Sequence, residues 1–253
     1  MAMNLSRLTA VLCLTFMMLI VPPTAATSKS YDDLSDVYIL CNTQNYTAGD
    51  AFDNQLKASL TSLQQLAQRR SSYRLLQIRG PGITLMTSFQ CRGDLSPSKC
   101  SECVTAAVQT ASSSCPSSIG SRVQKNGCFL RYEQYSYNVE DSSVVVELCN
   151  TQKNTDPYFK NQVQGIVSRV ISSAPRHKNL FASASVSLGS QKGSSAGFKL
   201  YALAQCQGYL SPGQCADCLT AHSSSWQDCD AAVGSQIHSV SCYYRFETYP
   251  FFY

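Results

Sequence analysis

The chain carries little charge and has no basic block. Only 14% of its 253 residues are Asp, Glu, Lys or Arg, and 20 basic against 16 acidic residues give a formal net charge of +4. No run of Lys or Arg is present that could follow a phosphate backbone. Nucleic acid is therefore not expected as a partner.

Histidine is scarce and confined to one half of the chain. The three histidines are His177, His222 and His238, and the first half has none. A metal or catalytic site that recurs in both halves cannot depend on residues present in one half only. No Ser, His and Asp stand in a nucleophile motif. We therefore expect no metal, no cofactor and no enzymatic activity.

Long apolar runs are absent beyond the N-terminus. Residues 8–21 form an apolar stretch shorter than the roughly 20 residues needed to span a bilayer. Arg7 precedes this stretch and the small residues Thr24, Ala25 and Ala26 follow it. The pattern predicts a signal peptide at residues 1–26, and removing Arg7 leaves a net charge of 19 − 16 = +3. We expect a secreted, extracellular (apoplastic) product without stable membrane insertion.

Cysteine is abundant, and its spacing repeats. Cleavage would remove Cys13 from the 13 cysteines and leave six in each half. The segment "CRGDLSPSKCSEC" returns as "CQGYLSPGQCADC", so that Cys-x8-Cys-x2-Cys occurs at Cys91, Cys100 and Cys103 and again at Cys206, Cys215 and Cys218. The repeat predicts two tandem domains, at residues 27–138 and 144–253, joined by a short polar junction.

Each copy carries the signals of two helices and several strands. Asp50 and Asp156 stand at the start of the first helix of each copy, and Ser96 and Ser211, each followed by Pro, stand at the start of the second. Residues 83–90, 119–124, 128–135 and 144–148 are rich in β-branched and aromatic side chains, which favour strands. This order predicts an α+β fold, an antiparallel sheet with helices on one face.

The Cys-x2-Cys pair of the second helix admits three interpretations. A redox pair would need a βαβ context, and a zinc site would need further ligands at close spacing. Structural disulfides fit an even number of cysteines in an exported chain, and each would stabilise the fold by roughly 2–4 kcal/mol. Six cysteines allow fifteen pairings, and the sequence alone does not select among them.

These motifs, with "CNTQ" at Cys41 and "GSRVQ…CFLRYEQ" further on, resemble the ginkbilobin-like (stress-antifungal) domain of plants. Two such domains after a signal peptide resemble a plant cysteine-rich repeat secretory protein. The resemblance implies a five-stranded antiparallel sheet with two helices on one face in each domain. It also implies three disulfides per domain: Cys41–Cys115, Cys91–Cys100 and Cys103–Cys128, then Cys149–Cys229, Cys206–Cys215 and Cys218–Cys242.

The resemblance further implies a mannose site in the first domain, made of Asn42, Arg122 and Glu133. A sugar hydroxyl both donates and accepts, and these side chains supply donors and acceptors together. If residues 126–127 form a two-residue hairpin turn, Arg122 lies opposite Arg131, and Glu133 is its diagonal neighbour at roughly 7–8 Å.

The same residues also have a structural interpretation. Asn42 could form a turn, and Arg122 and Glu133 an exposed ion pair worth less than about 1 kcal/mol. In the second domain Gln236 stands where the first has Arg122, so mannose binding is not expected there.

We therefore expect a secreted mannose-type carbohydrate-binding protein that acts in plant defence against fungi or in stress responses. Its partners would be mannose-containing glycans or fungal glycoproteins. The alternative is an extracellular protein-interaction module for receptor ectodomains or cell-wall signalling, without lectin activity. The sequon at residues 45–47 predicts glycosylation of Asn45, close to Asn42.

Overall fold

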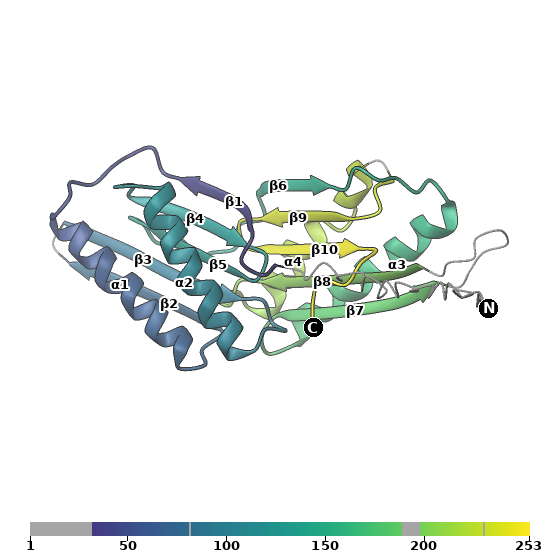
Figure 1. The fold of residues 1–253 in the computed structure, drawn as a ribbon, viewed down its shortest axis with the longest axis horizontal. Coiled ribbons are helices and arrows are strands. Elements are labelled where there is room, and N and C mark those ends of the chain that lie inside the picture. Colours follow the sequence, from purple (N-terminus) through teal and green to yellow (C-terminus); the bar gives the residue numbers. More distant parts are fainter. Residues whose placement is uncertain (1–31, 81, 189–197, 230) are drawn as a thin grey trace, which may run out of the picture. The chain divides into compact units, whose positions relative to one another are not determined.

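The computed structural model describes residues 32–80, 82–188, 198–229 and 231–253 (Figure 1). The expected signal peptide at residues 1–26 lies outside these ranges. No helix in the described part of the chain has the length and apolar character needed to cross a membrane.

The first repeat contains two helices and five strands. In chain order these are β1 (Asp36–Cys41), α1 (Ala51–Gln68), β2 (Tyr73–Gly80), β3 (Ile83–Cys91), α2 (Pro97–Ser114), β4 (Gly120–Lys125) and β5 (Cys128–Glu133). The strands form one antiparallel sheet in the order β1-β4-β5-β3-β2.

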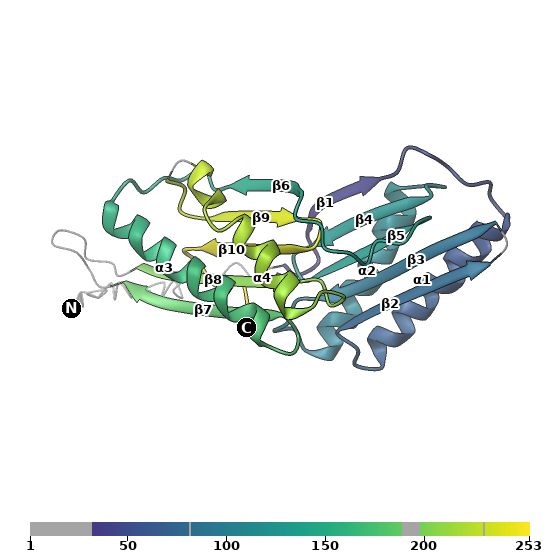
Figure 2. The same ribbon diagram turned by 180° about the vertical axis from the view of Figure 1, so that it is seen from behind.

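The second repeat has the same plan. Its elements are β6 (Val144–Cys149), α3 (Pro157–Ser173), η1 (Ala174–Arg176), β7 (Phe181–Leu188), β8 (Phe198–Cys206), α4 (Pro212–Ala221), η2 (Ser225–Cys229), β9 (Ser235–Ser239) and β10 (Cys242–Glu247). The sheet order β6-β9-β10-β8-β7 matches that of the first repeat. In each repeat the helices cover one face of the sheet (Figures 1 and 2), so the expected α+β fold with two five-stranded sheets is confirmed.

The helices begin at the expected capping residues. The Asp50 carboxylate accepts a hydrogen bond from the Asp53 N–H at 2.8 Å, and the Asp156 carboxylate accepts one from the Tyr158 N–H at 2.9 Å. Ser211 forms a full capping box with Gln214. Each cap satisfies an N–H group that the first turn of a helix would otherwise leave unpaired.

Alternation along the strands gives each sheet an apolar face under the helices and a polar face opposite. In β5, Cys128, Leu130 and Tyr132 pack into the core beneath α1 and α2, whereas Arg131 and Glu133 point to the other face. This alternation places the charged residues of the candidate site together on the open face of the first sheet.

Six disulfides connect the sheets to the helices, three in each repeat, as expected. The bonds are Cys41–Cys115, Cys91–Cys100, Cys103–Cys128, Cys149–Cys229, Cys206–Cys215 and Cys218–Cys242. These are the pairs that the resemblance implies. In each repeat one bond joins the first strand to the segment that follows the second helix.

The second helix differs most between the repeats. Helix α2 has 18 residues, whereas α4 has 10 and gives way to η2. The cause lies in the core, where the Tyr244 hydroxyl donates to the His222 carbonyl and accepts from the Trp226 N–H. These bonds satisfy the backbone at the end of α4, so the helix ends there.

The segment after the last strand of each repeat folds back over the open face of its sheet. In the first repeat the Tyr137 ring lies 3.9 Å from the Arg131 guanidinium, and in the second the Phe251 ring lies 4.4 Å from that of Arg245. Both aromatic side chains are buried. Each arginine is therefore covered by a ring that favours a cation.

The two repeats contact each other through reciprocal hydrogen bonds. The Gln90 amide donates to the Cys206 carbonyl at 3.1 Å, and the corresponding Gln205 amide donates to the Cys91 carbonyl at 3.0 Å. Because equivalent residues exchange equivalent bonds, the contact has the character of a twofold, isologous interface within one chain.

Candidate functional site

The candidate site is built around the buried carboxylate of Glu133, at the end of β5. Its Oε1 accepts hydrogen bonds from Arg122 Nε at 3.2 Å and Arg131 Nε at 3.1 Å. The β4–β5 register places Arg122 opposite Arg131, as expected from a hairpin turn at residues 126–127. One carboxylate oxygen therefore joins two guanidinium groups.

Arg122 differs from Arg131 in its exposure. The Arg122 side chain is 21% exposed and that of Arg131 only 4%. Burial alone would lower the pKa of Arg122, but the charge of Glu133 and the hydrogen bond to Tyr135 outweigh burial and raise its pKa above the ordinary value. Arg122 is thus a partly exposed cation that already pairs with Glu133.

Asn42 joins this group through the backbone of Gly120. The Asn42 N–H donates to the Gly120 carbonyl at 2.8 Å, and a Cβ at position 120 would lie 2.1 Å from Glu133 Oε2. Only glycine leaves room for the carboxylate there. The Asn42 side-chain oxygen accepts from the Gln44 N–H at 2.9 Å, which is the turn expected of an Asn at this place.

The structure thus brings Asn42, Arg122 and Glu133 into one region, and their hydrogen-bonding groups are largely used within the protein. Glu133 is 4% exposed and holds two arginines, so the ion pair is more buried than the exposed pair of the structural interpretation. The arrangement can offer a ligand the outer edge of Arg122 and the hydroxyl and ring of Tyr135, which is 47% exposed.

Sequence reasoning did not assign a role to Arg131, Tyr135 or Gly120. The signal was present, because "RYEQY" in the first repeat returns as "RFETY" in the second. Period-two alternation places Arg131 on the same face as Glu133. The Tyr135 hydroxyl accepts from Arg131 at 3.3 Å and from Arg122 at 3.5 Å, which completes the cluster.

Among the described residues, the equivalent region of the second repeat has one arginine, Arg245. Arg245 donates to Glu247 Oε1 from Nε at 3.0 Å and from a terminal nitrogen at 2.8 Å. Gln236 lies opposite Arg245 and contacts His238 instead. Burial raises the pKa of Glu247, and the charge of Arg245 opposes this without cancelling it.

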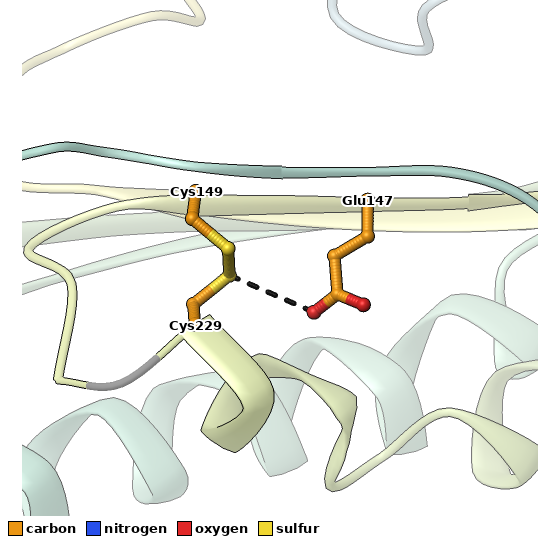
Figure 3. A group of neighbouring side chains, drawn as sticks. All are labelled: Glu147, Cys149 and Cys229. Carbon is orange, nitrogen blue, oxygen red and sulfur yellow. Dashed lines mark hydrogen bonds between the residues drawn. A yellow bond between two sulfur atoms is a disulfide. The ribbon is translucent and has the colours of Figure 1, made fainter.

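A group of potential metal ligands lies at Glu147, Cys149 and Cys229 (Figure 3). The two sulfurs are bonded to each other, and Glu147 Oε1 lies 3.6 Å from Cys229 Sγ. Disulfide sulfur is not the thiolate that binds zinc. This group therefore offers a metal ion one carboxylate only.

Comparison with known proteins identifies the family and supports the fold. The profile of the Salt stress response/antifungal family matches residues 40–135 and 148–249. Plasmodesmata-located protein 7 of Arabidopsis thaliana is 29% identical over 93% of this chain and 76% of its own length. Cysteine-rich repeat secretory protein 42 of the same plant is 27% identical over 88% of this chain and 90% of its own length.

Solved structures agree with the fold. The tandem DUF26 ectodomain of the Arabidopsis thaliana cysteine-rich receptor-like protein PDLP8 superposes with a TM-score of 0.73 at 24% identity, covering 86% of this chain and all of that one. The corresponding ectodomain of PDLP5 gives 0.70 at 25% identity, covering 85% of this chain and all of that one.

The fold, the six disulfides and these relatives define an extracellular module of two disulfide-bonded α+β repeats. The chain belongs to the Salt stress response/antifungal family, with two copies of its domain. The expected relationship to the cysteine-rich repeat secretory proteins is therefore confirmed.

Proposed function

We propose that this chain is an extracellular protein-interaction module and that its ligand is another protein, such as a receptor ectodomain. The observation that carries the proposal is that two acceptor oxygens of the candidate sugar site, Glu133 Oε1 and the Asn42 side-chain oxygen, already accept hydrogen bonds within the protein. Glu133 accepts from two arginines, and the Asn42 oxygen accepts from the backbone. A sugar would have to compete with these bonds for its own.

What the site presents to solvent suits a protein surface. Leu40 is 44% exposed and lies opposite Arg122 across β1 and β4, and Tyr135 is 47% exposed beside it. Together we call these three residues the Leu40–Arg122–Tyr135 surface. Tyrosine and arginine beside exposed apolar residues are the side chains that dominate protein–protein interfaces.

The second repeat has an equivalent surface. Leu148, 38% exposed, lies opposite Gln236, and Tyr249 is 41% exposed. Two related surfaces on one chain can engage two regions of one partner. That arrangement gives a protein ligand more contact area than either surface alone.

The test is binding of an extracellular protein in the presence of excess mannan. The immobilised chain is exposed to extracellular fluid, and the retained protein is then purified and titrated against it. We expect retention to persist with mannan and to fall about tenfold or more in Tyr135→Ala, as for loss of an interface hot spot. Elution of the ligand by mannan, or equal binding by Tyr135→Ala, would count against the proposal.

A second candidate function is mannose binding with antifungal activity. The observation in its favour is that Asn42, Arg122 and Glu133 lie in one region with the outer edge of Arg122 open. Calorimetric titration with mannose or mannan, together with fungal growth assays, tests it. A heat of mannose binding that is present in the unaltered chain and absent in Arg122→Gln would support this function. If the unaltered chain gives no heat of binding, this function is refuted.

A further inference from the structure

The two repeats enclose a cleft of about 770 Å³ beside their interface. The first repeat contributes Tyr73 and Arg74 at the start of β2, and the second contributes the segment from His177 to Leu180 before β7. Arg74, His177, Lys178 and Asn179 are exposed at its walls. No Asp or Glu among the described residues lines this cleft.

The absence of carboxylates extends well beyond the cleft. Residues 54–93 and 157–216 contain no Asp or Glu, although the chain has 16. The same two stretches hold twelve of its 20 basic residues, namely Lys57, Arg69, Arg70, Arg74, Arg79 and Arg92, then Lys160, Arg169, Arg176, Lys178, Lys192 and Lys199. The described residues of these stretches form most of α1, with β2 and β3, in one repeat and α3, η1, β7, β8 and the start of α4 in the other.

Among the described residues, to which Lys192 does not belong, the topology gathers this charge toward one end of each sheet. Strands β2 and β3 lie at one end of the first sheet, and β7 and β8 lie at the matching end of the second. Residues of both basic stretches line the cleft, among them Arg74 and Lys178, so positive charge from both repeats contributes to the potential there.

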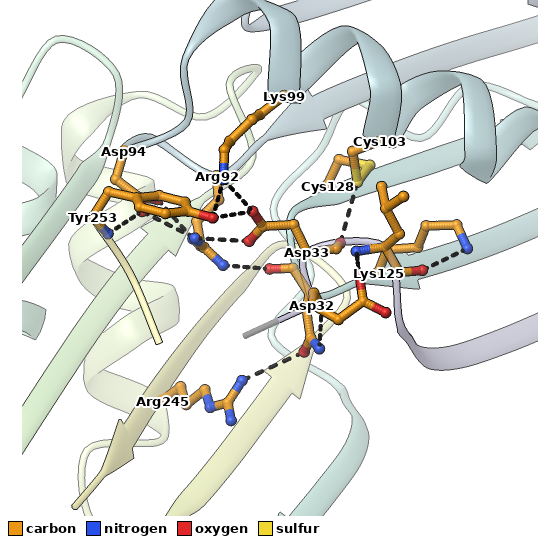
Figure 4. Close-up of polar contacts among 12 residues, drawn as sticks. Asp32, Asp33, Arg92, Asp94, Lys99, Cys103, Lys125, Cys128, Arg245 and Tyr253 are labelled. Carbon is orange, nitrogen blue, oxygen red and sulfur yellow. Dashed lines mark hydrogen bonds and ion pairs between the residues drawn. A yellow bond between two sulfur atoms is a disulfide. The ribbon is translucent and has the colours of Figure 1, made fainter. Parts of the chain in front are cut away.

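One cation of the cleft is neutralised within the protein. Arg92 is 3% exposed and pairs with Asp33 at 3.1 Å and Asp94 at 2.6 Å, beside the C-terminal Tyr253 (Figure 4). Arg74 and Lys178 are exposed instead, and neither Asp33 nor Asp94 is among the described residues that line the cleft. Arg74 and Lys178 are therefore the cations that an incoming anion would meet.

The cleft also adjoins the backbone of an edge strand. Strand β2 is the outermost strand of its sheet, and its outer N–H and C=O groups have no strand partner among the described residues. Strand β7 holds the same place in the second sheet. An extended peptide can hydrogen-bond to such an edge, whereas a saccharide cannot continue a β-ladder.

We propose that this inter-repeat cleft binds an acidic, extended peptide segment of the partner protein, with Arg74 and Lys178 contacting its carboxylates. The proposal rests on the proposed function, because it names the kind of segment that the protein ligand presents. It assigns recognition to a site separate from the Leu40–Arg122–Tyr135 surface.

The test uses the full mature chain and two labelled decapeptides, one of alternating Glu and Ser and one with Gln in place of Glu. Fluorescence anisotropy measures the affinity for each. We expect the Glu peptide to bind about tenfold or more tightly than the Gln peptide, and its binding to weaken as salt rises from about 50 to about 300 mM. Equal affinities for the two peptides would overturn the proposal.

Matched variants locate the site. Arg74→Gln combined with Lys178→Gln should weaken the Glu peptide about tenfold, because two exposed cations are lost. Lys160→Gln removes an exposed charge from the same carboxylate-free stretch outside the cleft and should change affinity by less than about twofold. An equal loss in Lys160→Gln would mean general charge attraction and would overturn the assignment.

Two further outcomes distinguish the peptide-binding cleft from the proposed function as a protein-interaction module. An oligo-uronate that binds through Arg74 and Lys178 while the Glu peptide does not would overturn the peptide assignment. If the protein ligand no longer binds to Tyr135→Ala but still binds to the Arg74→Gln and Lys178→Gln double variant, the proposed function is supported and the role of the cleft is refuted. Complete loss of binding of that protein ligand to the double variant would support the role of the cleft.

Discussion

The Glu133 carboxylate lies between two guanidinium groups with little access to water. Arg131 has a side chain that is 4% exposed, so its charge depends on this carboxylate. Glu133→Gln removes the charge at nearly constant shape and leaves Arg131 as a buried, uncompensated cation. We expect the free energy of unfolding to fall by about 3–5 kcal/mol, measured by denaturant titration with the disulfides intact.

The chain itself supplies the control for this prediction. Arg122→Gln reproduces the second repeat, where Gln236 stands opposite Arg245 and a single arginine pairs with the glutamate. Because Arg131 keeps its partner, the loss should not exceed about 1 kcal/mol. If Arg122→Gln destabilised as much as Glu133→Gln, the burial of Arg131 would not be the reason for the cost.

His238 is the second residue that supports a prediction, because its burial should make the stability of the protein depend on pH. Its ring stacks on Tyr243 at 4.8 Å and meets the edge of Tyr38 from the first repeat at 5.8 Å. Burial, and then the nearby charge of Arg245, lowers the pKa of His238 to about 3. Gln236 is its other polar neighbour, at 3.2 Å. No carboxylate among these neighbours stabilises the protonated ring.

The sign of the pH effect follows from this depressed pKa. Above about pH 6.5 the ring is neutral in both folded and unfolded chains, so stability is complete. Between about pH 6.5 and 3 only the unfolded chain gains the proton, and stability falls by up to ~1.4 kcal/mol per pH unit. His238→Phe should flatten this slope in unfolding measured across pH, whereas His177→Gln, an exposed control, should not. A slope unchanged in His238→Phe would refute the assignment.

Among the structural elements, we expect the first strand of each repeat to depend most on its disulfide. Strand β1 lies at the edge of its sheet and pairs only with β4 among the described strands. Cys41–Cys115 closes a loop of sequence separation 74, whereas Cys91–Cys100 has a separation of 9. Loop-closure entropy predicts stabilisation of about 4.5 kcal/mol for the first and about 2.7 kcal/mol for the second.

Paired substitutions test this ranking. Replacing both Cys41 and Cys115 by Ser should lower the unfolding midpoint more than replacing both Cys91 and Cys100, as followed by circular dichroism in urea. Native-state hydrogen exchange should also rise first in β1 when the longer loop is opened. The reverse order of midpoints would show that strain or packing, rather than loop length, sets the contribution of each bond.

The elements that the sequence predicted are those marked by local chemistry. Asp50, Asp156 and Ser211 cap helices because their oxygens satisfy backbone N–H groups one turn away, and such signals can be read from neighbouring residues. Strand β2 was not among the expected strands. Its sequence "YRLLQIRG" lacks strict alternation, and it is a strand because β3 pairs with it along its whole length.

The sequence predicted where the residues of the candidate site lie, but it did not predict how deeply they are buried. Alternation and a two-residue turn place Arg122 near Glu133, as observed. The burial of that pair depends on the segment carrying Tyr135 and Tyr137, which folds back over the sheet. Tyr135 and Tyr137 follow β5 directly, and the strand alternation that places Arg131 and Glu133 does not predict that this segment folds back. Whether Asn42, Arg122 and Glu133 bind sugar, and whether Asn45 is glycosylated, stay predictions.

At the scale of the whole molecule, two glycines allow the repeats to approach each other. A Cβ at Gly93 would lie 2.3 Å from the Phe181 ring, and a Cβ at Gly208 would lie 2.6 Å from the Tyr73 ring. Each glycine belongs to one repeat and each ring to the other, so the two contacts are reciprocal. The glycine is present in both "CRGD" and "CQGY", but the sequence does not show why. The contact between the repeats does, because each glycine leaves room for an aromatic ring of the other repeat.

We therefore predict that Gly93→Ala and Gly208→Ala each destabilise the protein by about 1–3 kcal/mol, because a methyl group would force backbone or ring to move. Gly165→Ala is the control, since it lies within α3 with open space around it, and it should stabilise by about 0.5–1 kcal/mol. Unfolding in urea measures all three. In a double-mutant cycle, Gly93→Ala combined with Phe181→Ala should cost less than the sum of the single changes, since the smaller side chain admits the added methyl. Strict additivity would mean that the cost of Gly93→Ala arises in its own loop and that the repeats do not meet at this point.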